Sequence, residues 1–209
     1  MKREIETIRP EEIEKRSFEL IEAELKTSPA EELKPIIKRV IHTSADFDYE
    51  DNLCFSEEVV KIAEKAIRNG ACIVTDTNMA KAGINKSSLA RFGGEVFCFM
   101  ADEDVAAEAR ERGITRAAVS MEKASKLEKS LIFAIGNAPT ALICLHEMIE
   151  TGKIKPELII GVPVGFVNVV EAKELIMETK VPYIVARGRK GGSNDAAAIC
   201  NALLYRIKD

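Results

Sequence analysis

The sequence predicts an α/β protein, a three-layer α/β/α sandwich around a flavodoxin-like, doubly wound sheet of about five parallel strands with an N-terminal helical extension. Short, almost wholly apolar runs recur from residue 71 onward, as expected of strands covered on both faces. Segments with helical spacing separate these runs, and such alternation produces parallel strands with right-handed crossovers. The first 70 residues show mainly helical patterns.

The first third of the chain is predicted to hold three helices. Pro10 and the two glutamates after it make a good helix start, because proline and acidic residues suit a first turn. The apolar face of this helix carries one polar residue, Ser17. A second helix is predicted from about 30 to 42. The polar segment 43–55 is predicted to be a loop, and a third helix is expected over 56–70, with Asn-Gly at its end.

Residues 71–209 are predicted to form the α/β core of one domain that spans residues 1–209. The predicted strands are 71–75, 95–100, 131–135, 158–162 and 182–186. The predicted helices of this part are 102–112, 139–151, 168–179 and 194–207. Doubly wound sheets bind ligands beyond the carboxyl ends of their strands, so we expect the site in the turns that leave the strands.

Composition excludes several classes of protein. The chain has 209 residues, of which 46% are hydrophobic and 31% charged, so it can bury a core and is not of the disordered class. No apolar run is long enough to span a membrane, and the N-terminus has no apolar signal core. A net charge of −4 does not favour nucleic acid. Five scattered cysteines, two histidines and no CxxC favour free thiols in a reducing cytoplasm over disulfides or a metal site.

The segment IGNAPT, residues 135–140, is a candidate anion-binding turn. Gly136 permits a tight exit from the strand, and Pro139 suits the first turn of the next helix. Asn137 and Thr140 would then present side chains and free backbone N–H groups at a helix N-terminus, which suits a carboxylate or a phosphate. A helix cap without any ligand is the alternative. The turn GVPVGFVN, 161–168, is interpreted as structural when taken alone, with its final asparagine as the cap of the following helix.

The segment RGRKGGSN, residues 187–194, is the strongest candidate for an anion site. It supplies three cations, two glycines that allow close backbone approach, and a hydroxyl at the start of the last helix: Arg187, Arg189, Lys190, Gly191, Gly192 and Ser193. The alternative is a solvated basic turn. The segment is not a P-loop, and no GxGxxG follows the first strand of the core, so neither a nucleotide nor a dinucleotide fingerprint is present.

His42 is a candidate acid–base group at the end of the second predicted helix. A histidine titrates near neutrality and can give or take a proton. The alternative is a histidine that only interacts with the negative end of the helix dipole. Ser17 has two interpretations as well, a satisfied core hydroxyl or a group aimed at a ligand, and both remain open.

Six segments together resemble a known family. They are RSFELI (16–21), RVIHTSADFD (39–48), IVTDTNMAKAGI (73–84), AIGNAPTAL (134–142), IIGVPVGFVNVVEAK (159–173) and RGRKGGSNDAAAICNAL (187–203). In this order they are similar to the precorrin-8X and cobalt-precorrin-8 methylmutases of cobalamin biosynthesis, and the resemblance runs from about residue 9 to 205.

The resemblance implies an intramolecular transfer of a methyl group. The methyl on C11 of a ring-contracted corrinoid precursor moves to C12, in what is described as a 1,5-sigmatropic shift, and yields hydrogenobyrinate or cobyrinate. The family's catalytic histidine falls on His42, which would protonate or hydrogen-bond the region of ring C. No organic cofactor is implied, and cobalt, where present, arrives inside the substrate. Whether the substrate carries cobalt stays open.

The resemblance also implies contacts and an assembly. The substrate rim carries several carboxylates, which the turns 135–140 and 187–194 would hold. Ser17 is expected near the histidine, and Asp76, Thr77 and Asn78 are expected at the ring edge. Arg116 and Arg91 are further candidates for carboxylates. Family members are homodimers with sites near the subunit interface, and we expect the same here.

Two other functions remain possible from sequence. A non-catalytic corrinoid carrier would use the same anionic-rim site without proton chemistry. A flavodoxin-like nucleotide- or flavin-binding domain would use phosphate-compatible turns, although the fingerprints named above are missing.

Overall fold

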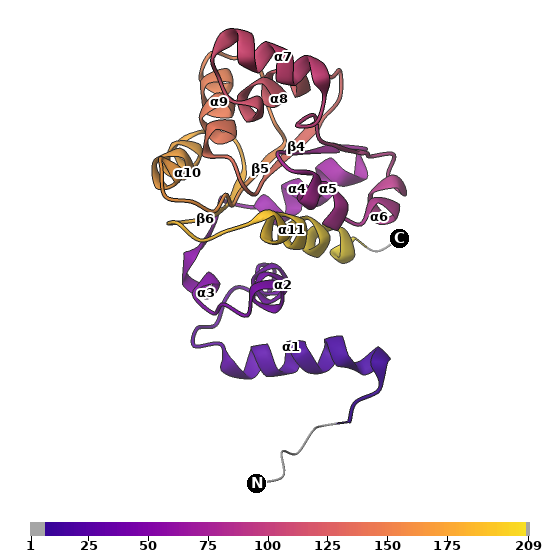
Figure 1. Cartoon of the computed structure of the whole chain (residues 1–209). Coiled ribbons are helices and arrows are strands. Elements are labelled where there is room, and N and C mark those ends of the chain that lie inside the picture. Colours follow the sequence, from indigo (N-terminus) through magenta and orange to yellow (C-terminus); the bar gives the residue numbers. More distant parts are fainter. Residues whose placement is uncertain (1–6, 208–209) are drawn as a thin grey trace.

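A computed structural model describes residues 7–207, and its centre is a six-stranded sheet (Figure 1). The strands lie in the order β1-β6-β5-β4-β2-β3. Their bounds are Leu53–Phe55 (β1), Cys72–Thr75 (β2), Val96–Phe97 (β3), Leu131–Ile135 (β4), Leu158–Gly161 (β5) and Tyr183–Ala186 (β6).

The five predicted strands are present, and they are parallel to each other. Counted along the chain from β2, their order is 2-1-3-4-5, which is the order of flavodoxin-like sheets. The strand order reverses between β2 and β4. The residues of β2, β4 and β5 are all buried, which explains why these runs are continuously apolar.

The segment 43–55, predicted to be a loop, contains a short helix and a sixth strand. This prediction is wrong because β1 is antiparallel to β6 and pairs Leu53 with Ala186 and Phe55 with Ile184. A strand of three residues is too short to show an alternating pattern, and its partner lies about 130 residues further along the chain. The sheet is therefore mixed, and the N-terminal part contributes to it.

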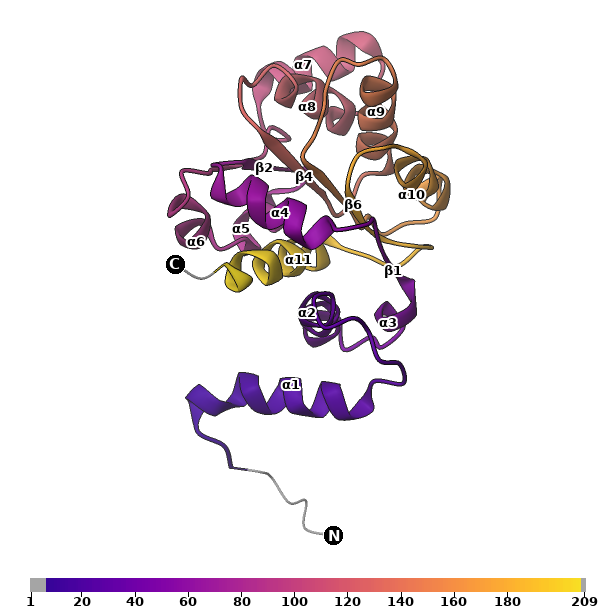
Figure 2. The ribbon, with the colours of Figure 1, turned by 180° about the vertical axis from the view of Figure 1, so that it is seen from behind.

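Helices cover both faces of the sheet, as the predicted sandwich requires (Figures 1 and 2). On one face the core is formed with Val59–Arg68 (α4), Asn78–Gly83 (α5), Lys86–Ala90 (α6) and Ser193–Arg206 (α11). On the other it is formed with Arg116–Ala124 (α8), Pro139–Glu150 (α9) and Val169–Glu178 (α10), and Glu103–Arg112 (α7) packs against α8. Lys34–Ser44 (α2) packs on α11, and Ile13–Glu24 (α1) lies outside α2, after the turn Pro10–Glu12 (η1).

Several local predictions need correction. Four short helices were not predicted: Tyr49–Asn52 (α3), α5, α6 and α8. Asn168 does not cap α10 with its side chain; its backbone is instead left-handed, with φ of 56°, a conformation that asparagine tolerates. All five cysteines are free thiols. Within residues 7–207 no helix is long and apolar enough to cross a membrane.

Candidate active site at the carboxyl ends of the strands

Three turns at the carboxyl ends of β4, β5 and β6 are in backbone contact. Gly136, directly after β4, lies so close to α11 that a Cβ atom on it would stand 2.6 Å from the Cα atom of Ser193. A Cβ atom on Gly191, after β6, would stand 2.1 Å from the carbonyl oxygen of Val162. The Gly192 N–H donates to that same oxygen at 2.9 Å. The close backbone approach predicted for the paired glycines is therefore made to the turn after β5.

The backbone amides of the turn after β4 are bound by Asp76, the residue that follows β2. Its carboxylate accepts the N–H groups of Gly136 at 2.9 Å, Asn137 at 2.8 Å and Ala138 at 2.6 Å. Asp76 is fully buried, and burial raises the pKa of its carboxyl group although the three donors oppose this shift. The prediction of a free N–H group for an anionic ligand is therefore wrong at Asn137, because Asp76 already accepts that group.

Residues from the turns after β2 and β6 also meet. The hydroxyl groups of Thr77 and Ser193 share a hydrogen bond of 2.7 Å. Asn78, the first residue of α5, and Asn137 are exposed. Asp76 and Thr77 therefore join the turns to each other, while the two asparagines remain accessible at the same edge.

Arg116 lies beside the turn after β4, and Arg91 does not. The Thr115 hydroxyl donates to the Thr140 hydroxyl at 2.9 Å, which brings exposed Arg116, the first residue of α8, next to the start of α9. Arg91 directly follows α6, and the chain then runs past the residues that precede β2. Arg91 thus lies near the amino edge of the sheet, away from the turns, so the arrangement within one chain does not favour its contact with the same ligand.

The three cations of the turn after β6 differ in their partners. The Arg187 guanidinium donates to both oxygens of Glu174, at 2.9 and 3.2 Å. Lys190 is paired with two aspartates. Arg189 forms no ion pair with any residue that the structure describes, and it is exposed and lies 5.6 Å from the centroid of the Phe166 ring. Arg189 is therefore the cation of this turn whose charge is least neutralised.

The pairing of Lys190 brings the predicted acid–base group to this edge. Its ammonium lies 2.6 Å from Asp46 and 2.5 Å from Asp48, in the segment that follows α2. The Lys190 ammonium lowers the pKa of the Asp46 carboxyl group. His42 is exposed in the last turn of α2, four residues before Asp46. The turn after β6 and the end of α2 are thus one connected structure.

His42 and the predicted residue Ser17 lie on adjacent helices. The imidazole of His42 stands against the ring of Phe18 on α1, with centroids 5.2 Å apart. Ser17 is half-buried, and its hydroxyl donates to the carbonyl of Ile13 in its own helix at 2.9 Å. The aromatic contact limits the positions that the imidazole can take.

The turn after β5 exposes an apolar segment that sequence reasoning did not single out. Phe166 is 80% exposed and Val167 79% exposed, and Val164 is also exposed. Such residues next to three polar turns are a signal for a binding surface, because solvated loops seldom carry contiguous large apolar side chains. The signal was visible in the sequence as VGFV between two strands.

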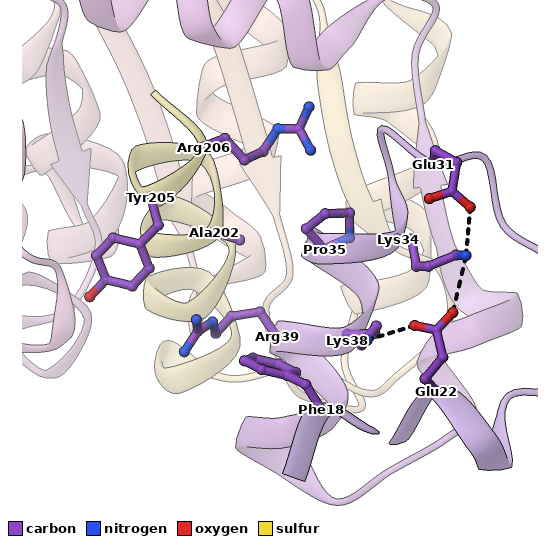
Figure 3. A pocket seen from close by; sticks show the side chains of 10 residues that line it. All are labelled: Phe18, Glu22, Glu31, Lys34, Pro35, Lys38, Arg39, Ala202, Tyr205 and Arg206. Carbon is purple, nitrogen blue, oxygen red and sulfur yellow. Dashed lines mark hydrogen bonds and ion pairs between the residues drawn. The ribbon is translucent and has the colours of Figure 1, made fainter. Parts of the chain in front are cut away.

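A separate hollow of about 450 Å³ lies between α1, α2 and the end of α11 (Figure 3). Its lysines are held by ion pairs with Glu22 and Glu31, and Arg39 lies between the rings of Phe18 and Tyr205. Because its cations are engaged internally and none of the strand-end turns lines it, we place the candidate site at the turns.

Comparison with known proteins identifies the class and then the family. A sheet with five parallel strands, interlocked polar turns at their carboxyl ends and an accessible histidine beside these turns has the architecture of an α/β enzyme. The sequence profile of precorrin-8X methylmutase matches residues 12–206. The chain is 45% identical to a cobalt-precorrin-8 methylmutase of Priestia megaterium, over 94% of this chain and 88% of that protein. It is 44% identical to a cobalt-precorrin-8 methylmutase of Salmonella typhimurium, over 96% and 97%.

The solved structures agree with the sequence comparisons. A precorrin-8X methylmutase from Thermus thermophilus superposes with a TM-score of 0.84 at 40% identity, covering 93% of this chain and 96% of that one. The chain belongs to the precorrin-8X methylmutase family. It is accordingly an enzyme of the isomerase class.

Proposed function

We propose that this enzyme moves the methyl group on C11 of precorrin-8, or of its cobalt form, to C12 and so produces hydrogenobyrinate or cobyrinate. The observation that carries the proposal is the ion pair between Lys190 and Asp46, because it joins the end of α2, with exposed His42, to the cationic turn after β6. Relatives named for the cobalt-containing and the metal-free substrate both occur, so the proposal covers both.

His42 is the proposed proton donor and acceptor. The C11–methyl bond breaks and the C12–methyl bond forms within one molecule, so no proton is gained or lost overall. A proton that His42 lends to the region of ring C, or a hydrogen bond from it, biases the conjugated system toward migration and is recovered afterwards. The Phe18 ring, 5.2 Å away, supports the imidazole from one side. The rearrangement requires no organic cofactor, and any cobalt belongs to the substrate.

The turns are proposed to hold the carboxylates of the substrate rim. Arg189 is the principal contact because it alone among the cations of its turn has no carboxylate partner within the described residues. Arg116 and the exposed Asn137 extend the rim across the turn after β4, and Asn78 extends it beyond β2. The other predicted contacts remain proposals in this scheme: Ser17, Thr140, Arg187, Lys190, Gly191, Gly192 and Ser193.

Asp76 and Thr77 have a different proposed role. Asp76 is fully buried, with three amides bound to its carboxylate, and Thr77 is bonded to Ser193. We assign to both the positioning of the turns that contact the substrate. The apolar faces of a corrinoid call for an apolar surface, which exposed Phe166 and Val167 supply beside Arg189.

The enzyme is further proposed to be a homodimer with its sites near the subunit interface. Helix α1 supports this proposal, because it packs mainly on α2 and leaves Ile13 52% exposed and Leu20 45% exposed. The molar mass measured by light scattering during gel filtration tests it. A mass near twice 23.0 kDa supports the dimer, and a mass near 23.0 kDa contradicts it.

Incubation with precorrin-8 or cobalt-precorrin-8, followed by visible absorbance, tests the activity. We expect the chromophore of the rearranged product to form with wild-type enzyme. His42→Ala should retain product binding and lose turnover by at least about a hundredfold, as is typical for removal of a general acid–base group. His146→Ala is the matched control, because this second histidine lies in α9 outside the site. Tight product binding without any turnover in wild type would support the carrier instead.

A further inference from the structure

Lys173 is the most unusual charged residue of the described chain. It lies in α10 and has no exposed surface, although lysine is almost never fully buried without a charged partner. Its ammonium donates to the carbonyl of Gly188 at 2.8 Å and to the carbonyl of Lys190 at 2.8 Å. Among the described residues it forms no ion pair. Two carbonyl oxygens therefore take the place of a carboxylate.

The two carbonyls belong to Gly188 and Lys190, the residues on either side of Arg189. Lys173 thus holds the backbone of both neighbours of the cation proposed to bind the substrate. The same turn is held from its other side, because the carbonyl of Arg189 accepts the Gly165 N–H at 3.2 Å. The backbone on either side of the Arg189 side chain is consequently fixed by contacts to α10 and to the turn after β5.

A second buried group borders this arrangement. Asp195, in the first turn of α11, is 3% exposed and acts on Lys173 by its charge. One of its oxygens accepts the Tyr49 hydroxyl at 2.7 Å, and the other has no hydrogen-bond partner. Tyr49 starts α3, in the segment that also carries the partners of Lys190. The buried side chains of Lys173, Asp195 and Tyr49 thus lie beneath the turn after β6, on its side that faces the core.

We propose that Lys173 is a positioning residue that fixes the turn after β6 so that Arg189 is presented to a carboxylate on the rim of the substrate. This inference rests on the proposed function and adds to it a residue that does not touch the substrate. A well-packed apolar residue in a buried position is usually as stable as a buried charge, so stability alone does not account for Lys173. Pre-organisation of the turn accounts for it, because a cation whose backbone is already ordered loses less entropy when it binds a ligand.

The test measures binding of two probes to the full-length enzyme. One probe is cobyrinate, and the other is cobyrinate whose peripheral carboxylates are converted to amides. We expect Lys173→Met to weaken cobyrinate binding about tenfold and to weaken binding of the amidated probe less than twofold, since only the former needs Arg189. Lys180→Met, at an exposed lysine before β6, is the control and should bind both probes like wild type. Equal losses of affinity for both probes in Lys173→Met would overturn the proposal.

A double-mutant cycle adds a second criterion. If Lys173 acts through Arg189, Arg189→Ala should weaken cobyrinate binding by a much smaller factor in the Lys173→Met background than in wild type. If the loss of cobyrinate affinity in the double variant equals the product of the losses in the two single variants, Lys173 and Arg189 act independently and the proposal is overturned. If Lys173→Met does not fold, hydrogen exchange of residues 187–192 in wild type decides. Slow exchange before cobyrinate is added supports a pre-ordered turn, and fast exchange contradicts it.

These outcomes separate the inference from the function on which it rests. Failure of wild type to convert precorrin-8 or to bind cobyrinate would remove the proposed function itself. Normal conversion by wild type, with equal cobyrinate affinity in Lys173→Met, would remove only the role of Lys173.

Discussion

Lys190 forms an ion pair with Asp46, at 2.6 Å, and thereby connects the turn after the last strand to the residues that follow His42. The two residues are distant in sequence, and each belongs to a segment with a different proposed task. The turn is proposed to bind the substrate rim, whereas the end of α2 is proposed to supply the proton. Because both side chains are partly exposed, the ion pair adds little to overall stability. Its main effect is to hold the turn after β6 and the end of α2 in a fixed relative position.

Substitution of Lys190 should therefore affect catalysis more than folding. We expect Lys190→Ala to lower kcat about tenfold, because the end of α2 is released from the turn and His42 is less well placed. The melting temperature should change by only a few degrees. Asp46→Asn should have a similar effect, and the double variant should be little worse than either single one. Independent, multiplying losses in kcat would contradict this coupling.

Arg189 and Arg187 provide a matched pair for testing the rim. Arg189→Ala should raise the dissociation constant of cobyrinate about tenfold to a hundredfold, because a charge-assisted hydrogen bond to a carboxylate is lost. Arg187→Ala should have a smaller effect, since Glu174 already engages that guanidinium. Titration of the enzyme with cobyrinate by visible absorbance measures both. A larger effect at Arg187 would show that its ion pair opens for the substrate.

The sequence was sufficient to predict the five parallel strands of the sheet, and it led to the predictions, still to be tested, of a site at their carboxyl ends and of His42 as a candidate acid–base group. Those predictions depend on local features, such as apolar runs or a histidine at a helix end. What the sequence could not show were contacts between distant segments. Nothing near 135–140 indicates that its amides are bound by Asp76, some 60 residues earlier. The pairing of β1 with β6 is hidden for the same reason.

The sequence also could not show which carboxylates pair with the cations of the turn after β6. The segment 187–190 presents three equivalent positive charges when read alone, and only the fold brings Glu174 and Asp46 to two of them. The burial of Lys173 is hidden as well, because lysine is rarely buried and no local feature of the sequence marks this one. The fold places it at the carbonyls on both sides of Arg189.

Asp76 should be important for stability as well as activity. Asp76→Ala leaves three backbone amides near the site without their acceptor, and that of Gly136 lies in a tightly packed, buried turn. We expect a loss of unfolding free energy of at least about 3 kcal/mol, since each unsatisfied buried donor costs about 1–3 kcal/mol. Asp76→Asn retains one acceptor oxygen and should lose less. Urea unfolding measures both, and a loss below about 1 kcal/mol for Asp76→Ala would contradict the assigned contacts.

The buried ammonium of Lys173 gives a test that depends on pH. Burial lowers the pKa of Lys173 from 10.5 to about 8, and the charge of Asp195 opposes this shift. Between about pH 8 and pH 10.5 the unfolded chain therefore binds more protons at this residue than the folded chain does, so the contribution of Lys173 to the unfolding free energy rises with pH. Lys173→Met lacks this contribution.

The unfolding free energy of wild type, relative to that of Lys173→Met, should thus increase by on the order of 1–2 kcal/mol between pH 7 and pH 9.5. Both carbonyl contacts can survive loss of one proton, because a neutral amine still has two N–H donors for Gly188 and Lys190. Urea unfolding at a series of pH values measures the difference, with Lys180→Met as the control that keeps the wild-type profile. A difference between wild type and Lys173→Met that is constant with pH would mean that Lys173 keeps its ordinary pKa despite its burial.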